Sequence, residues 1–105
     1  MKNPDFISFL SDLIAHGKDL QYKNRYGAIV AVKIQPLMKL DKVNSDPATV
    51  KKLTDLGVQD AIVIGNDENG IPILLNTKTL KTYLLDPGIT QPGEYLKNEI
   101  SIKVS

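Results

Sequence analysis

Apolar residues near the start of this chain recur at the spacing of an amphipathic helix. Over residues 5–16 the apolar side chains fall on one face of a helix, while serines and aspartates fall on the other. Asn3 and Pro4 are residue types that commonly start a helix, and Gly17 is one that commonly ends it. We therefore expect a helix that ends near His16 and packs on a core through these residues: Phe6, Ile7, Phe9, Leu10, Leu13 and Ile14.

Between residues 60 and 85, three apolar runs are separated by two polar breaks. The first break contains Asn69-Gly70, a pair that readily adopts the positive φ of a hairpin turn. The spacing predicts a β-meander with strands near 61–64, 71–75 and 80–85. Beyond it, Pro87-Gly88 and Pro92-Gly93 each predict a type II turn.

The remaining segments complete a predicted order of α-β-α-β-β-β-β. Residues 26–34 are rich in β-branched side chains and predict a central strand ending before Pro36, with residues 37–40 as an irregular edge. Asp46 and Pro47 predict the start of a second helix that ends before Gly57. Alternation over residues 99–105 predicts a half-exposed strand. We expect one α+β domain over residues 1–105, its mainly antiparallel sheet packed against the N-terminal helix.

The composition argues against several kinds of chemistry. The chain has no Cys, which excludes disulfides, thiol catalysis and thiolate metal sites. Its one histidine, His16, stands at a predicted helix end, where positive charge is stabilised, and we favour that role over catalysis with Ser8 or Ser11. No glycine spacing matches a phosphate-binding loop. We expect no catalytic residue and no cofactor, and keep a ligand-binding domain or an enzyme of unrecognised type as a third alternative.

An acidic turn next to Gly70 has the residue types of a calcium-binding loop. Its spacing does not match: with Gly70 at the loop glycine, Gly65 would stand at the first ligand position and Asn76 at the last. Neither residue supplies the carboxylate that these positions need. We expect a hairpin turn here and no bound metal.

One segment of the chain is more basic than the rest. The net charge of +1 gives no overall field to attract nucleic acid or membrane, but residues 18–42 hold six basic and only two acidic side chains. Within it, aromatic and basic side chains alternate, and Tyr and Arg are enriched at binding surfaces. A solvated loop would explain the same residues. The predicted partner-binding site consists of Tyr22, Lys23, Arg25 and Tyr26.

By elimination and from its size, we expect a non-enzymatic protein-binding module of the immunity, inhibitor or phage-accessory type. The main alternative is a small nucleic-acid-binding protein that uses the basic segment 18–42. Residues 62–87 are similar to the central hairpins of a protein family many of whose members act as immunity proteins against secreted toxins, although this chain lacks that family's long N-terminal helical region. No apolar run approaches the roughly 18 residues of a membrane span and no secretory signal is visible, so we expect a cytoplasmic protein without a membrane partner.

Overall fold

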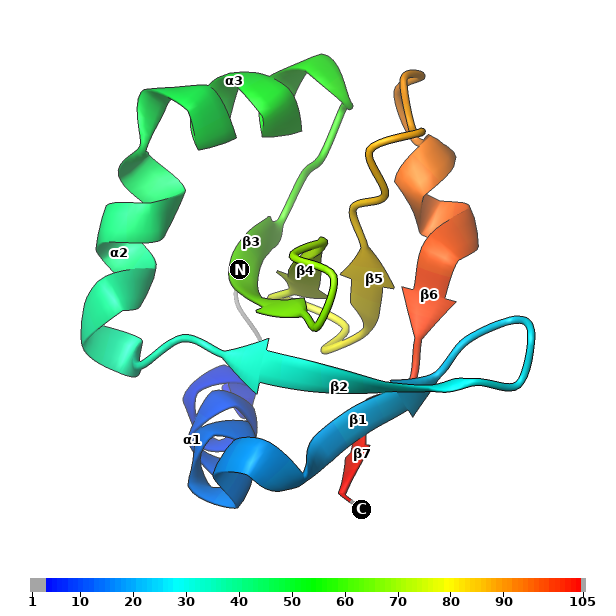
Figure 1. Cartoon of the computed structure of the whole chain (residues 1–105). Coiled ribbons are helices and arrows are strands. Elements are labelled where there is room, and N and C mark those ends of the chain that lie inside the picture. The colour runs from blue at the N-terminus through cyan, green and yellow to red at the C-terminus, as the bar shows by residue number, and fades with distance from the viewer. Residues whose placement is uncertain (1–3, 105) are drawn as a thin grey trace.

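A computed structural model describes residues 4–104 and contains short helices and strands (Figure 1). In chain order these elements are α1 (Phe6–His16), the 3-10 helix η1 (Gly17–Asp19), β1 (Leu20–Lys23), β2 (Ile29–Ile34), α2 (Leu37–Ser45), α3 (Pro47–Asp55), β3 (Ala61–Asp67), β4 (Pro72–Asn76), β5 (Thr82–Leu84), the 3-10 helix η2 (Glu94–Asn98), β6 (Glu99–Ile100) and β7 (Lys103–Val104).

The strands form one antiparallel sheet in the order β6-β5-β4-β3-β2-β1-β7. Its two edge strands, β6 and β7, are separated only by residues 101 and 102. Because three residues of extended chain span at most about 11 Å, the sheet must curl until its two edges are close together. The predicted α+β class, with an N-terminal helix on a mainly antiparallel sheet, is confirmed.

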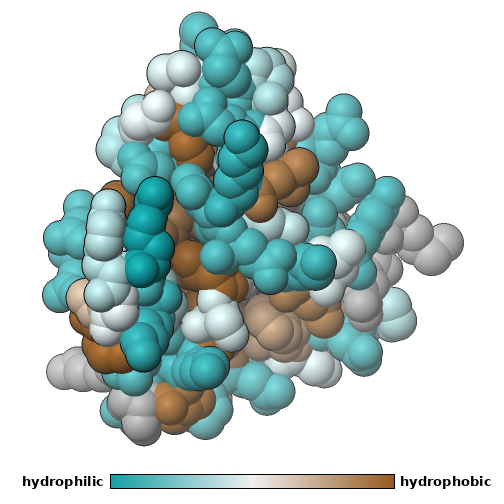
Figure 2. Space-filling model, turned by 90° about the vertical axis from the view of Figure 1, so that its right-hand side faces the viewer, coloured by the Kyte–Doolittle hydropathy of each residue, from teal (hydrophilic) through white to brown (hydrophobic). Residues whose placement is uncertain are grey.

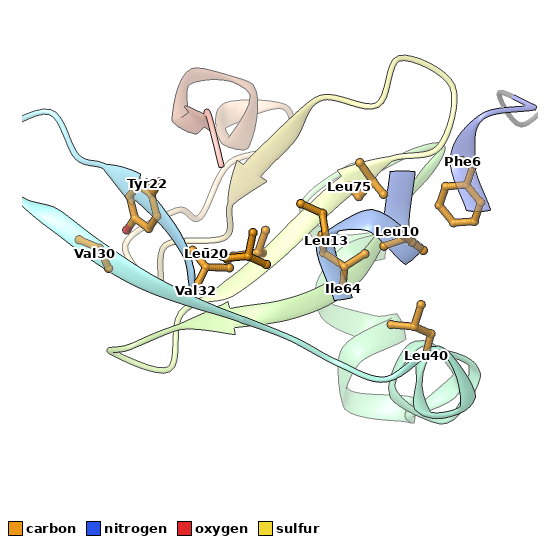
Figure 3. Close-up of a cluster of buried hydrophobic side chains, with 11 residues drawn as sticks. Phe6, Leu10, Leu13, Leu20, Tyr22, Val30, Val32, Leu40, Ile64 and Leu75 are labelled. Carbon is orange, nitrogen blue, oxygen red and sulfur yellow. The ribbon is translucent and has the colours of Figure 1, made fainter. Parts of the chain in front are cut away.

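Helix α1 packs against the inner face of this curled sheet. Leu10 is fully buried, and it lies in one cluster with strand residues such as Ile64 and Leu75 (Figure 3). The expectation that Ile7 also packs on the core is wrong, because its side chain is 57% exposed. Gly17 ends the helix with a positive φ of 56°, and its N–H donates to the carbonyl oxygen of Ile14, as the sequence predicts. The N-cap is Asp5 rather than Asn3, which lies outside the described residues.

A second cluster covers the outer face of the meander β3–β5. Val63, Leu74 and Tyr83 stand opposite one another across the three strands and belong to this cluster. Leu56, at the end of α3, packs on them from one side. From the other side comes Tyr95 of η2, whose ring meets that of Tyr83 edge to face at 5.6 Å. The meander is therefore covered on both faces (Figure 1).

The backbone of β2 comes close to Gly65 of β3. Gly65 pairs with Ile34 of β2, and a Cβ atom at Gly65 would meet the backbone carbonyl oxygen of Lys33. A side chain therefore has no space here unless the two strands separate.

Two segments contain regular structure that the sequence prediction missed. Residues 18–25 include strand β1, and the strand expected from Tyr26 begins only at Ile29 because residues 24–28 form a hairpin turn. Strand β2 lies between β1 and β3 and is therefore central, as predicted, although its face formed by Ile29, Ala31 and Lys33 is exposed. The irregular edge expected over residues 37–40 is wrong, since α2 begins at Leu37.

Helix α2 packs on the core through Leu40, and the side-chain amide of Asn44 hydrogen-bonds it to the sheet. Asn44 accepts the backbone N–H of Val63 at 2.8 Å and donates to the carbonyl oxygens of Val63 and Leu40, both at 2.9 Å. The next helix, α3, begins as predicted, because the Asp46 carboxylate accepts the N–H of Thr49.

The C-terminal prediction also needs correction. The single strand expected over residues 99–105 is divided: β6 pairs with β5, and β7 pairs with β1 at the opposite edge. Of the two expected type II turns, the one at Pro92-Gly93 is confirmed: Gly93 has a φ of 80°, and the N–H of Glu94 donates to the carbonyl oxygen of Gln91. Gly88 does not have a positive φ, and its N–H donates to the Asp86 carboxylate, a contact that favours the type I turn.

Candidate partner-binding site

The predicted binding residues lie at and beside the turn between β1 and β2. Tyr26 is 83% exposed at the tip, and the guanidinium of Arg25 lies 5.8 Å from the centre of its ring. Lys23, at the end of β1, is also exposed. Three of the four predicted residues are thus brought together on one surface.

Tyr22 is the exception and corrects the prediction. Its side chain is buried in the core, and its hydroxyl donates to the carboxylate of Asp67 at 3.0 Å. Burial, this hydrogen bond and the charges of nearby carboxylates raise the pKa of Tyr22 to about 12. Tyr22 cannot offer its ring for stacking on a partner, and it holds the base of the hairpin instead.

The hairpin tip is fixed by Asn24. Its side-chain oxygen accepts the backbone N–H groups of Tyr26 and Ala28, both at 2.9 Å. Gly27 follows with a φ of 83° and donates its N–H to the carbonyl oxygen of Asn24. This is a three-residue hairpin loop that needs a residue of positive φ in its last position.

The hairpin between β3 and β4 has the same construction. The Asp67 carboxylate accepts the N–H groups of Asn69 and Ile71, and Gly70 has a φ of 78°. The predicted turn at Asn69-Gly70 is confirmed. Both loops share the sequence pattern Asn/Asp-x-x-Gly, which is the signal that would have revealed the first hairpin.

The two hairpins form one wall of a cleft of about 680 Å³. Helix η2 and strand β6 line the other wall. Figure 2 views the molecule from this side and shows hydrophobic surface in a hollow between hydrophilic groups. The apolar lining consists of Val30, Ile71, Leu84 and Ile100.

Charges of both signs surround this cleft. Lys23, Arg25 and Lys97 form no ion pair with any side chain of the described chain. Among the acidic lining residues, the Glu99 carboxylate lies 3.8 Å from the Lys81 ammonium group. The Asp67 carboxylate accepts hydrogen bonds from the Tyr22 hydroxyl and from the N–H of Asn69 in its own turn. The remaining carboxylates are those of Asp86 and Glu94. The cleft lining thus contains three cations and four carboxylates, so its formal charges nearly balance.

The basic segment 18–42 does not form one surface. Lys39 and Lys42 lie on α2, which Figure 1 shows at the opposite end of β2 from the hairpin tip. Only the part around Lys23 and Arg25 reaches the cleft. An extended phosphate-binding face is therefore not assembled from this segment.

The other chemical candidates remain separate. His16 is exposed in the last turn of α1, the position that the sequence predicts. Within residues 4–104, no three His, Cys, Asp or Glu side chains come close enough to hold a metal ion. The helices in this range are too short or too polar to cross a bilayer.

The fold and cleft define a small α+β domain with a curled antiparallel sheet. No protein-family model matches the chain, and no curated protein or solved structure shows significant similarity to it.

Proposed function

We propose that this protein is a non-enzymatic protein-binding module, of the immunity, inhibitor or phage-accessory type, that docks through Lys23, Arg25 and Tyr26. The observation that carries the proposal is the exposed Tyr26 ring beside the Arg25 guanidinium. Both residue types are enriched among the side chains that dominate interface energies. The Asn24 turn supports the proposal, because a tip that is already ordered loses little conformational entropy on binding.

The nucleic-acid alternative is less well supported by the same surface. Stacking of a base on Tyr26 would place phosphates near the carboxylates of Asp86 and Glu94. Tyr22 is buried, and Lys39 and Lys42 lie elsewhere. A protein partner with both charged and apolar groups fits the mixed lining better.

Photo-crosslinking in the cells that make the protein tests this function. Tyr26 is replaced by the photoreactive residue p-benzoylphenylalanine, and a matched control carries it at Met38, which is 88% exposed on α2. We expect a discrete protein adduct from position 26 that is absent from position 38. Equal labelling from both positions, or no protein adduct from position 26, would refute the proposal. An adduct removed by nuclease would support the nucleic-acid alternative instead.

The double substitution K23E/R25E then tests the charges of the site. These exposed residues make no internal ion pair within the described chain, so the stability should change by about 0.5 kcal/mol or less. The captured partner should associate more slowly with the variant, and the wild-type advantage should shrink at high salt. Unchanged rate and affinity would show that these charges are only solvated.

A further inference from the structure

We propose that Asn69 is a site of spontaneous deamidation, and that its conversion to isoaspartate uncouples the two hairpins that line the cleft. The reaction needs no reagent besides water. Three features of the β3–β4 turn single out this residue and gate its reaction.

The first feature is the residue that follows Asn69. In deamidation the backbone nitrogen of the next residue attacks Cγ of the asparagine and closes a succinimide ring. The Cγ–Nδ2 bond breaks, and Nδ2 takes up the proton of the attacking N–H and leaves as ammonia. Gly70 hinders this attack least, because it has no side chain, whereas every other asparagine of the chain is followed by a residue that has one.

The second feature is the freedom of the Asn69 side chain. It is exposed at the turn, and its amide group makes no hydrogen bond to any residue within 4–104. Other asparagine side chains are held by hydrogen bonds, among them those of Asn24, Asn44, Asn66 and Asn76. The Cγ atom of Asn69 is therefore open to attack.

The third feature is a hydrogen bond that holds the attacking nitrogen. The Gly70 N–H donates to the carbonyl oxygen of Asp67 at 3.0 Å, and the nitrogen must leave this bond before it attacks Asn69. The reaction therefore proceeds through an opened turn. The Asp67 carboxylate keeps the turn closed and also accepts the Tyr22 hydroxyl, so this link should set the rate of deamidation.

The product changes the turn that produced it. Water opens the succinimide at either carbonyl carbon and gives aspartate or isoaspartate. In isoaspartate the main chain runs through Cβ and Cγ, so it gains a methylene group between positions 69 and 70. One oxygen of Asp67 accepts the N–H of Asn69 at 2.9 Å and that of Ile71 at 3.0 Å, and the longer chain cannot keep both distances. The Asp67 carboxylate then no longer joins its own turn to Tyr22.

Peptide mass spectrometry after prolonged incubation at mildly alkaline pH tests the site and its gate. We expect the mass gain of an amide-to-acid conversion at Asn69, with a product that protein-isoaspartate methyltransferase labels. The rate should be at least about tenfold higher in urea, since tenfold corresponds to 1.4 kcal/mol, the order of the hydrogen bonds that must open. Tyr22→Phe should react at least about twofold faster than wild type, because it weakens the closed turn.

The matched control for the gate is Leu10→Ala, which lowers the overall stability without touching either hairpin and should react like wild type. For the product, amide hydrogen exchange at Ile71 should be faster in the isolated isoaspartate form, whereas Asn69→Asp, which adds the charge without the methylene, should keep the wild-type rate. The proposal is overturned if Asn69 stays unmodified, or if another asparagine reacts faster. Equal rates in folded and unfolded protein, equal acceleration in Leu10→Ala, or an isoaspartate form that still protects Ile71 would also overturn it.

Discussion

Removing the Tyr22 hydroxyl should change how the stability of the protein depends on pH. Below pH 10 the hydroxyl donates to the buried carboxylate of Asp67. A hydrogen bond to a charged group contributes about 1.5–3 kcal/mol, so Tyr22→Phe should lower the free energy of unfolding by that amount at pH 7. The carboxylate keeps the N–H groups of Asn69 and Ile71, so we expect the variant to fold.

At alkaline pH this difference should disappear. The pKa of Tyr22 rises from 10.0 in the unfolded chain to about 12 in the folded protein. A raised pKa stabilises the fold while the hydroxyl is protonated, and this contribution is present below pH 10 and lost as pH rises through 12. Two pH units correspond to about 2.7 kcal/mol. Phenylalanine cannot ionise, so the variant lacks this loss.

Urea unfolding followed by circular dichroism at several pH values between 7 and 12.5 measures the effect. The quantity of interest is the difference between wild type and Tyr22→Phe, in which the other titrating groups largely cancel. Tyr26→Phe is the control, because Tyr26 is 83% exposed and should show no such dependence. A difference that stays constant from pH 9 to 12.5 would refute the assigned role of the Tyr22–Asp67 hydrogen bond.

Three further substitutions test the fold by measured free energies of unfolding. Leu10→Ala should lower the free energy of unfolding by about 2–5 kcal/mol, because it leaves a cavity under α1. The control Ile7→Ala should lower it by about 0.5 kcal/mol or less, because the Ile7 side chain is 57% exposed on the same helix. A loss below about 0.5 kcal/mol for Leu10→Ala would contradict the placement of Leu10 in the core. Gly65→Ala should cost about 1–3 kcal/mol or more, because the added methyl meets the Lys33 carbonyl, and an unchanged stability would contradict that contact. Gly70→Val should lower the free energy of unfolding by about 1–2 kcal/mol, because valine resists the positive φ that Gly70 adopts. Calcium should leave the Tm of the wild-type protein unchanged, and a saturable rise of this Tm with calcium would show that the turn binds the ion.

Strong, local patterns in the sequence predicted the parts of the fold that depend on them. The N-terminal helix and the meander 61–84 have a clear apolar period and turn residues that favour one conformation. Strand β1 has only Leu20 and Tyr22 as inward residues, too few to distinguish a strand from a polar loop. Helix α2 buries only Leu40, and the tertiary contact from Asn44 that holds it has no local sequence signal.

For the C-terminal segment, the sequence does not determine which strands it pairs with. Its alternation predicts an extended conformation, but alternation does not specify a partner strand. Which edges β6 and β7 join depends on how far the sheet curls, and that is a property of the whole core. Prediction of the candidate site from sequence met a similar limit. Alternation of aromatic and basic residues located the hairpin, but the pairing of β1 in the sheet determines that Tyr22 faces inward and Lys23 faces outward.

The Asp67 carboxylate connects the two turns that line the cleft. One of its oxygens accepts the N–H groups of its own turn, and the other accepts the hydroxyl of Tyr22 at the base of the opposite hairpin. Two turns of the same construction are therefore tied together by a single buried group, so that movement of one would break a hydrogen bond to a charge. A cleft constrained in this way loses little conformational entropy when a ligand binds. The same acidic residue that resembles a calcium ligand in the sequence thus acts in the structure as the link that keeps Arg25 and Tyr26 in position.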